Sequence, residues 1–235
     1  MTKKNLLLLS SSRVEDTPYL DHAKEMIAEH LGQIKEVIFI PYAGVTITYD
    51  EYKQMVQSAL EDSGITIKSI HEYDNPVDAI QNAQAIAIGG GNTFRLLHQL
   101  YENGLVQAIQ DKVAHGTPYI GWSAGSNVAG ATIRTTNDMP IIEPPSFNAL
   151  NLVNFQINPH YTDYTPPGHN GETREQRLQE FMVLNPATHI VGIVEGTAIK
   201  MSGNQLKLIG GKDGFLFLNG EKTKIADGYD LTAIN

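Results

Sequence analysis

Short, continuous runs of apolar residues alternate with amphipathic stretches over the first two thirds of the chain. The apolar runs, each bounded by turn residues, are Asn5–Ser10, Glu36–Ile40, Thr66–Ile70, Ala85–Ile88, Pro118–Gly121 and Phe155–Asn158. Because they do not alternate apolar with polar positions, they are typical of strands buried on both faces of a parallel sheet. Between them, apolar residues recur at helical spacing in Asp21–Leu31, Tyr49–Leu60 and Thr93–Val113.

This alternation of strand and helix predicts a doubly wound α/β fold, in which helices flank both faces of a mostly parallel sheet. The C-terminal part differs, because the predicted strands Val191–Met201, Gln205–Ile209 and Gly214–Leu218 are separated only by hairpin turn sequences. They are expected to form an antiparallel C-terminal edge. No linker rich in Pro, Gly or Ser and no repeat divides the chain, so we expect residues 1–235 to form a single domain.

Composition excludes several classes of function. The formal net charge of −9 argues against nucleic-acid binding, which needs a basic surface. The absence of cysteine excludes disulfides, zinc thiolates and a thiol nucleophile, and it fits a cytoplasmic enzyme. Leu6–Leu9 follows two lysines, as in a signal peptide, but this run is too short and is interrupted by Ser10–Arg13. We therefore expect a cytoplasmic protein that does not contact a membrane.

A serine lies between two glycines where a predicted strand turns into a helix. The sequence Gly121-Trp122-Ser123-Ala124-Gly125 follows the apolar Pro118-Tyr119-Ile120 and precedes a helical pattern. A serine nucleophile on such a sharp turn needs glycines two positions away, because side chains there would collide. The turn projects Oγ at the carboxyl end of the sheet, above a helix N-terminus that favours an oxyanion. This context favours a nucleophile at Ser123 over a capping serine in an ordinary turn.

A serine nucleophile needs a general base, and the chain offers eight histidines. His160 follows the predicted strand that ends at Asn158, so it is expected at the same carboxyl edge of the sheet as Ser123. His169, in a Pro-Pro-Gly-His loop, is the alternative base.

The base in turn needs an acid to orient it, and two carboxylates are candidates. Glu195 lies inside the apolar run Ile190–Ala198, where an unpaired carboxylate would be costly. Asp138 lies in a loop just before Pro140, where a turn aspartate is common. Glu195 is favoured, and Asp138 stays open as its rival.

A second glycine cluster, Ile88-Gly89-Gly90-Gly91-Asn92-Thr93, also follows a predicted strand and opens a helix. The cluster could hold a phosphate, but it lacks the GxGxxG spacing and the lysine of a P-loop. The backbone amides of Gly90 or Gly91, together with that of Ala124, would instead form an oxyanion hole. Asn92 is a candidate helix cap and a candidate substrate-binding residue.

Four motifs together resemble one known family. They are Gly-Gly-Gly-Asn-Thr-Phe from Gly89, Gly-Trp-Ser-Ala-Gly-Ser-Asn from Gly121, Asn-Pro-His-Tyr from Asn158 and Glu-Gly-Thr-Ala from Glu195. In order and spacing they look like peptidase E, the alpha-aspartyl dipeptidase family, and the similarity covers nearly the whole chain. That family shares its fold with class I glutamine amidotransferases, whose elbow carries a cysteine at the position of Ser123.

The resemblance implies hydrolysis of dipeptides that begin with aspartate, with Ser123 as nucleophile and His160 as base. It leaves the acid open between residues matching Glu195 and Asp138. Binding an aspartyl side chain in an acidic protein requires a local cation, and Arg174 is the candidate because a guanidinium can bind a carboxylate through two parallel hydrogen bonds. The family comparison points the same way.

The resulting hypothesis is a serine peptidase that cleaves Asp-X dipeptides through an acyl-enzyme on Ser123, without a metal or organic cofactor. Its expected partner is a small peptide substrate, and the protein itself is either a monomer or a homodimer. Two other functions stay open. A cyanophycinase-like hydrolase would share the serine turn but cleave a beta-linked aspartyl-arginine polymer, and a non-catalytic module would bind a nucleotide at Gly89–Gly91.

Overall fold

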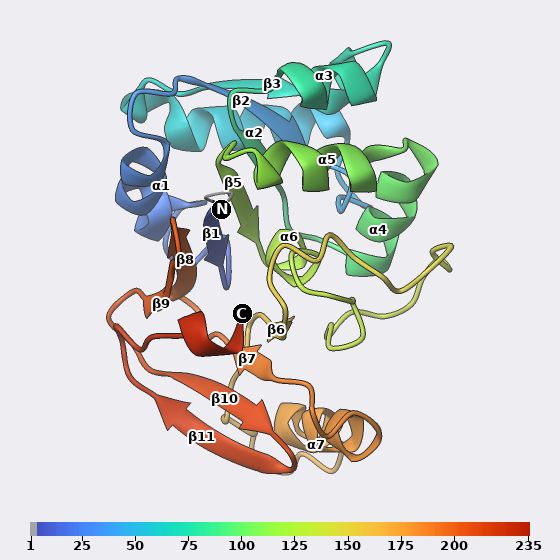
Figure 1. Ribbon diagram of the computed structural model, residues 1–235, viewed down its shortest axis with the longest axis vertical. Coiled ribbons are helices and arrows are strands. Elements are labelled where there is room, and N and C mark those ends of the chain that lie inside the picture. The colour runs from blue at the N-terminus through green and yellow to red at the C-terminus, as the bar shows by residue number, and fades with distance from the viewer. Residues whose placement is uncertain (1–3) are drawn as a thin grey trace.

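The computed structural model describes residues 4–235 and contains a seven-stranded sheet in the order β3-β2-β4-β5-β1-β8-β9 (Figure 1). Its strands are β1 (Asn5–Leu9), β2 (Glu36–Ile40), β3 (Thr66–Ser69), β4 (Ile86–Ile88), β5 (Tyr119–Trp122), β8 (Ala198–Ser202) and β9 (Gln205–Ile209). The first five are parallel to one another, whereas β8 and β9 run antiparallel at one edge. The predicted mostly parallel sheet with an antiparallel C-terminal edge is confirmed.

Helices cover both faces of this sheet because β1, β2, β4 and β5 bury residues on both sides. Leu7 and Leu9 of β1 pack in a core with α1 and α2, while Leu6 and Leu8 face a second core with α3, α4 and α5. The helices are α1 (Lys24–Leu31), α2 (Tyr49–Leu60), α3 (Pro76–Asn82), α4 (Thr93–Glu102), α5 (Leu105–Ala114), α6 (Ala124–Asn127) and α7 (Arg174–Leu184). Successive leucines of β1 thus point into two cores on opposite faces of the sheet, as expected for a doubly wound fold.

The prediction of one helix over Thr93–Val113 is wrong, because the structure has two. α4 ends at Glu102, and α5 begins at Leu105 after a break at Gly104. Gly104 has a φ of 65°, a left-handed conformation that ends a helix. Within residues 4–235, no helix combines the length and the apolar character needed to cross a membrane.

A second sheet of four strands, in the order β11-β10-β7-β6, occupies the lower half of Figure 1 and was not predicted. Its strands are β6 (Gln156–Asn158), β7 (Ile190–Gly192), β10 (Gly214–Leu218) and β11 (Glu221–Ile225). α7 packs on this sheet through Leu178 and Met182. The prediction that Phe155–Asn158 belongs to the main sheet is therefore wrong.

The prediction of a single strand over Val191–Met201 is also wrong. This segment contains β7 of the second sheet and β8 of the main sheet, joined by the loop 193–197. The chain changes direction at Gly196, whose φ is 91°. An apolar run therefore crosses from one sheet to the other, and its burial pattern alone does not show the break.

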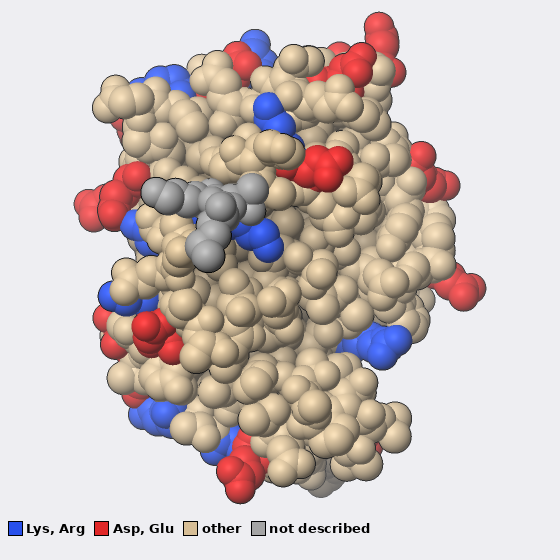
Figure 2. Space-filling model, viewed as in Figure 1, with Lys and Arg blue, Asp and Glu red and all other residues tan. Residues whose placement is uncertain are grey.

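On the face shown in Figure 2, charged side chains are spread out rather than gathered in one area. On the face shown in Figure 2, lysine and arginine side chains are separated from one another by acidic and uncharged residues. The net charge is −9, and residues 4–235 form no continuous basic surface on this face of the kind that binds nucleic acid.

The two glycines that flank Ser123 allow β5 to turn sharply into α6. A Cβ atom on Gly121 would overlap the carbonyl oxygen of Gly125, and one on Gly125 would overlap the carbonyl oxygen of Ile88 in β4. Both collisions are with backbone, which cannot move aside as a flexible side chain can. The turn is therefore packed directly against the neighbouring strand.

Replacing Gly125 with alanine is expected to lower the free energy of unfolding by about 3 kcal/mol, because the added methyl group overpacks a rigid backbone contact. The matched control is Gly171→Ala, whose methyl group would meet only the surface ring of His169. That variant is expected to stay within about 0.5 kcal/mol of the original protein. Urea unfolding followed by circular dichroism measures both, and equal stabilities for the two variants would contradict the packing argument.

Candidate active site

Ser123 lies at the end of β5 in a strained backbone conformation, with φ 54° and ψ −114°. Its carbonyl oxygen accepts hydrogen bonds from the backbone N–H groups of Ser126 and Asn127 at 3.0 and 2.9 Å. The buried Ser126 hydroxyl lies 2.6 Å from the carbonyl oxygen of Leu9 in β1 and 2.9 Å from that of Gly121. These contacts hold the turn in a conformation that a serine rarely adopts.

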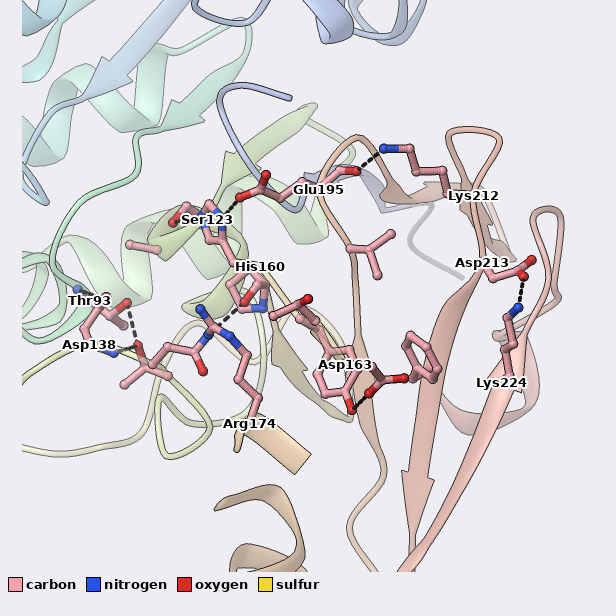
Figure 3. Close-up of a pocket in the computed structure, with 18 residues that line it drawn as sticks. Thr93, Ser123, Asp138, His160, Asp163, Arg174, Glu195, Lys212, Asp213 and Lys224 are labelled. Atoms are coloured by element: carbon pink, nitrogen blue, oxygen red, sulfur yellow. Dashed lines mark hydrogen bonds and ion pairs between the residues drawn. The ribbon is translucent and has the colours of Figure 1, made fainter. Parts of the chain in front are cut away.

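His160 lies against Ser123, with its Nε2 atom 2.9 Å from the serine Oγ (Figure 3). Like Ser123, His160 has a positive φ, at 53°. Its backbone N–H donates to the hydroxyl of Ser10 at 2.9 Å, and this buried hydroxyl donates to the carbonyl oxygen of Ile193 at 2.8 Å. The expectation that one sheet edge carries both residues is wrong, since His160 follows β6 of the second sheet.

Glu195 lies on the other side of the imidazole, with Oε1 2.8 Å from Nδ1 of His160. An acceptor at Nδ1 favours the tautomer with a proton on that nitrogen, which leaves Nε2 free to accept the serine proton. Lys212 steadies the loop by donating from Nζ to the Glu195 carbonyl oxygen at 3.1 Å. The Glu195 side chain is 51% exposed and lies in a loop, so it is not the carboxylate buried in a strand that its sequence context suggested.

The two alternative residues, Asp138 and His169, make other contacts. Asp138 accepts a hydrogen bond from the backbone N–H of Thr93 at 2.7 Å, at the N-terminus of α4 (Figure 3). No hydrogen bond within residues 4–235 joins Asp138 to His160. His169 lines a separate cavity that includes neither Ser123 nor His160.

Three backbone amides beside Ser123 have no hydrogen-bond acceptor within residues 4–235, namely those of Gly90, Gly91 and Ala124. Gly90 packs directly on the serine, since a Cβ atom there would lie 3.0 Å from Ser123 Cβ. The carbonyl oxygen of Gly90 accepts a hydrogen bond from the Tyr52 hydroxyl at 2.9 Å. Because the C=O and N–H of a trans peptide point in opposite directions, the N–H of Gly91 points away from Tyr52.

A chain of hydrogen bonds between aromatic side chains leads to this peptide. Trp122 donates from Nε1 to the Tyr19 hydroxyl at 2.8 Å, Tyr19 donates to the Tyr52 hydroxyl at 3.1 Å, and Tyr52 donates to Gly90. The chain therefore links the residue before Ser123 to the glycine loop. Tyr19 and Tyr52 were not predicted as functional residues, because neither belongs to a motif and their pairing depends on tertiary contacts.

Arg174 is the first residue of α7 and lines the same cavity as Ser123, His160, Glu195 and Asp138 (Figure 3). The cavity has a volume of about 780 Å³. The arginine is half-buried, and no ion pair or hydrogen bond within residues 4–235 engages its guanidinium. Burial, and next the nearby Arg177, lower the pKa of Arg174. A partly desolvated cation without a partner is suited to bind an anion.

Both polar ends of the Asn92 side chain are already engaged. Its Oδ1 accepts the backbone N–H of Arg95 at 3.0 Å and so caps α4, while its Nδ2 donates to the carbonyl oxygen of Met139 at 2.9 Å. The predicted cap is therefore present. The substrate-binding role of Asn92 stays a prediction.

A strained serine, a histidine and a carboxylate in hydrogen-bond sequence at the end of an α/β sheet have the geometry of a serine hydrolase. Comparison with known proteins then gives the family. The profile of peptidase family S51 matches residues 6–209. The chain therefore belongs to peptidase family S51, and it is a peptidase.

Sequence relatives agree with this family. The chain is 53% identical to peptidase E of Shewanella denitrificans over 231 residues, covering 97% of this chain and 98% of that protein. It is 58% identical to peptidase E of Shewanella baltica (strain OS155) over 221 residues, covering 94% and 93%. The predicted resemblance to peptidase E is confirmed.

Two solved structures have a similar fold. A protein described as a peptidase E from Listeria monocytogenes EGD-e superposes with a TM-score of 0.65 at 26% identity, covering 87% of this chain and 97% of that one. A peptidase from an acI-B1 Actinobacterium gives a TM-score of 0.71 at 19% identity, with 97% and 96% covered. The second likeness concerns the fold alone.

Proposed function

We propose that this peptidase hydrolyses dipeptides with an N-terminal aspartate through an acyl-enzyme on Ser123. The observation that carries this proposal is the half-buried Arg174, which has no ion pair within residues 4–235 and lies in the cavity that Ser123 and His160 also line. A cation in that position can hold the side-chain carboxylate of the substrate while the peptide carbonyl lies at the serine. The relatives named peptidase E support the same choice.

In the proposed reaction, Ser123 Oγ attacks the peptide carbonyl carbon while His160 Nε2 takes the hydroxyl proton. Glu195 stabilises the imidazolium that forms. The amides of Ala124 and of Gly91 or Gly90 donate to the developing oxyanion, since they have no other acceptor in the described chain. His160 then protonates the leaving amine, and water repeats the sequence on the ester to release aspartate.

The second candidate acid receives a different role in this scheme. One oxygen of Asp138 accepts the Thr93 amide, and the carboxylate lines the same cavity as Arg174. We propose that Asp138 binds the substrate α-amino group, while Arg174 binds the β-carboxylate. Opposite charges at these two points select a short substrate that begins with aspartate.

Neither alternative function is favoured by this geometry. A nucleotide phosphate at the N-terminus of α4 would meet the carboxylate of Asp138, which already accepts the Thr93 amide there. Hydrolysis of the beta-linked aspartyl-arginine polymer is separated from the proposed function by comparing that polymer with Asp-Leu. The cytoplasmic location, the single domain and the choice between monomer and homodimer stay predictions.

The two acids are expected to affect different kinetic constants. Glu195→Gln removes the charge that stabilises the imidazolium, so kcat on Asp-Leu should fall at least about tenfold with KM little changed. Asp138→Asn should mainly raise KM, because it weakens amine binding. Ser123→Ala, with unchanged circular dichroism, sets the background rate. A fall in kcat for Asp138→Asn but not for Glu195→Gln would reverse the assignment of the acid.

Tyr52→Phe is expected to lower kcat about tenfold while KM changes little, because the Gly90–Gly91 peptide loses the hydrogen bond that orients it and the oxyanion forms only in the transition state. The matched control is Tyr42→Phe. Tyr42 is also buried, and its hydroxyl has no hydrogen-bond partner within residues 4–235. Equal kcat values for the two variants on Asp-Leu would show that Tyr52 does not orient the peptide.

Arg174→Ala is expected to lower kcat/KM for Asp-Leu about 100-fold and to leave the slow hydrolysis of Asn-Leu nearly unchanged, since a charge-assisted pair is lost only for the charged substrate. Arg177→Ala is the matched control on the same helix, because Arg177 is exposed and lies 3.6 Å from Glu172. The panel also includes Glu-Leu and beta-aspartyl-leucine. Equal losses on Asp-Leu and Asn-Leu would rule out Arg174 as the carboxylate-binding residue.

A further inference from the structure

A second cavity, of about 500 Å³, meets the first at the reacting residues. Ser123 and His160 line both cavities, and no other residue of the described part of the chain (4–235) lines both. The walls of the second cavity come from the loops that follow β1, β2 and β4, from Tyr52 and Met55 of α2, and from Ile141. A peptide bond held at Ser123 therefore has a separate space available for each of its two halves.

The two cavities differ in chemistry. Among residues 4–235, no aspartate, glutamate, lysine or arginine lines the second cavity. Apolar side chains come from Val45, Ile47, Met55 and Ile141. We name this second cavity the apolar cavity. The first cavity, in contrast, carries charged residues on several sides: Asp138, Asp163, Arg174, Glu195, Lys212, Asp213 and Lys224. Charged and apolar groups are thus separated by the Ser123–His160 pair.

The mouth of the apolar cavity exposes large apolar side chains to water. Val45 and Ile141 are each 55% exposed. The segment that carries Ile141 is held in place, because Asn92 donates to the Met139 carbonyl oxygen and the Ile141 N–H donates to the same oxygen at 2.9 Å. Exposed apolar side chains fixed at the entrance of a cavity are typical of a ligand-binding surface.

We propose that the apolar cavity binds the side chain of the residue that leaves as the free amine, and that it selects large apolar residues at that position. This inference rests on the proposed function, in which Arg174 binds the aspartyl residue of the substrate in the first cavity. The leaving nitrogen must lie at His160 Nε2 to receive its proton, and His160 also lines the apolar cavity. The favoured substrates are therefore Asp-Leu, Asp-Met and Asp-Phe.

The expected preference is large because each buried methylene changes an affinity about fourfold. For the original protein, kcat/KM should be at least about tenfold higher for Asp-Leu than for Asp-Ala. Asp-Lys and Asp-Glu should be poorer still, since a charged side chain would lose its hydration without finding a partner in the apolar cavity.

The test measures kcat/KM on Asp-Gly, Asp-Ala, Asp-Leu, Asp-Phe, Asp-Lys, Asp-Glu and Asn-Leu. Val45→Ser and Ile141→Ser should each lower the Asp-Leu value at least about fivefold while the Asp-Gly value stays within twofold. The matched control is Val183→Ser, which removes an apolar side chain that is 79% exposed on α7 and lines neither cavity. Ile141→Glu should raise kcat/KM for Asp-Lys relative to that for Asp-Leu, because the new carboxylate can pair with the lysine ammonium group of the substrate.

The outcomes separate this inference from the function on which it rests. If Asp-Leu, Asp-Ala and Asp-Glu are cleaved equally well while Asn-Leu is not, the apolar cavity does not bind the leaving residue, although the aspartyl specificity stands. Equal effects of Ile141→Ser on Asp-Leu and Asp-Gly would overturn the inference in the same way. If no Asp-X dipeptide is cleaved, the proposed function fails and the inference fails with it.

Discussion

Hydrogen bonds to the C-terminal end of β1 hold both turns that carry the site residues Ser123 and His160. The carbonyl oxygen of Leu9, its last residue, accepts hydrogen bonds from the Ser123 N–H and the Ser126 hydroxyl, which position the serine turn. The next residue, Ser10, joins the His160 N–H to the carbonyl oxygen of Ile193. Two adjacent residues thus tie together a turn of the main sheet and a turn of the second sheet. Because Ser10 is fully buried, losing its hydroxyl would leave polar backbone groups without partners.

This attachment explains how two strained residues persist in one site. Ser123 and His160 both have positive φ values, which cost a non-glycine residue roughly 1 kcal/mol or more. The leucines of β1 are completely buried in the two cores on either side of the sheet, so the strand end cannot shift to relieve either turn. The apolar run seen first in the sequence therefore also sets the distance between Ser123 Oγ and His160 Nε2.

Local sequence patterns predicted the main sheet and the serine turn, because burial on both faces and a glycine-flanked turn have signatures within a few residues. They did not predict the second sheet, since β6 and β7 are three residues long and their burial depends on distant partners. Glu195 was favoured as a carboxylate buried in a strand, yet it lies half-exposed in a loop beside His160. The Tyr19–Tyr52 contact has no sequence signature, because residues far apart in the chain form it only after folding.

Because the site is partly exposed to water, a bound substrate changes the environment of its residues. His160 is 34% exposed and Glu195 is 51% exposed, so water screens their interaction in the free protein. In the proposed complex, the aspartyl residue of the substrate fills the first cavity and its apolar residue fills the apolar cavity. Both residues displace water from around the imidazole of His160. The attraction between Glu195 and the imidazolium then strengthens as the bond is cleaved. A substrate with one suitable residue on each side of the peptide bond would therefore both fit the two cavities and raise the reactivity of the serine between them.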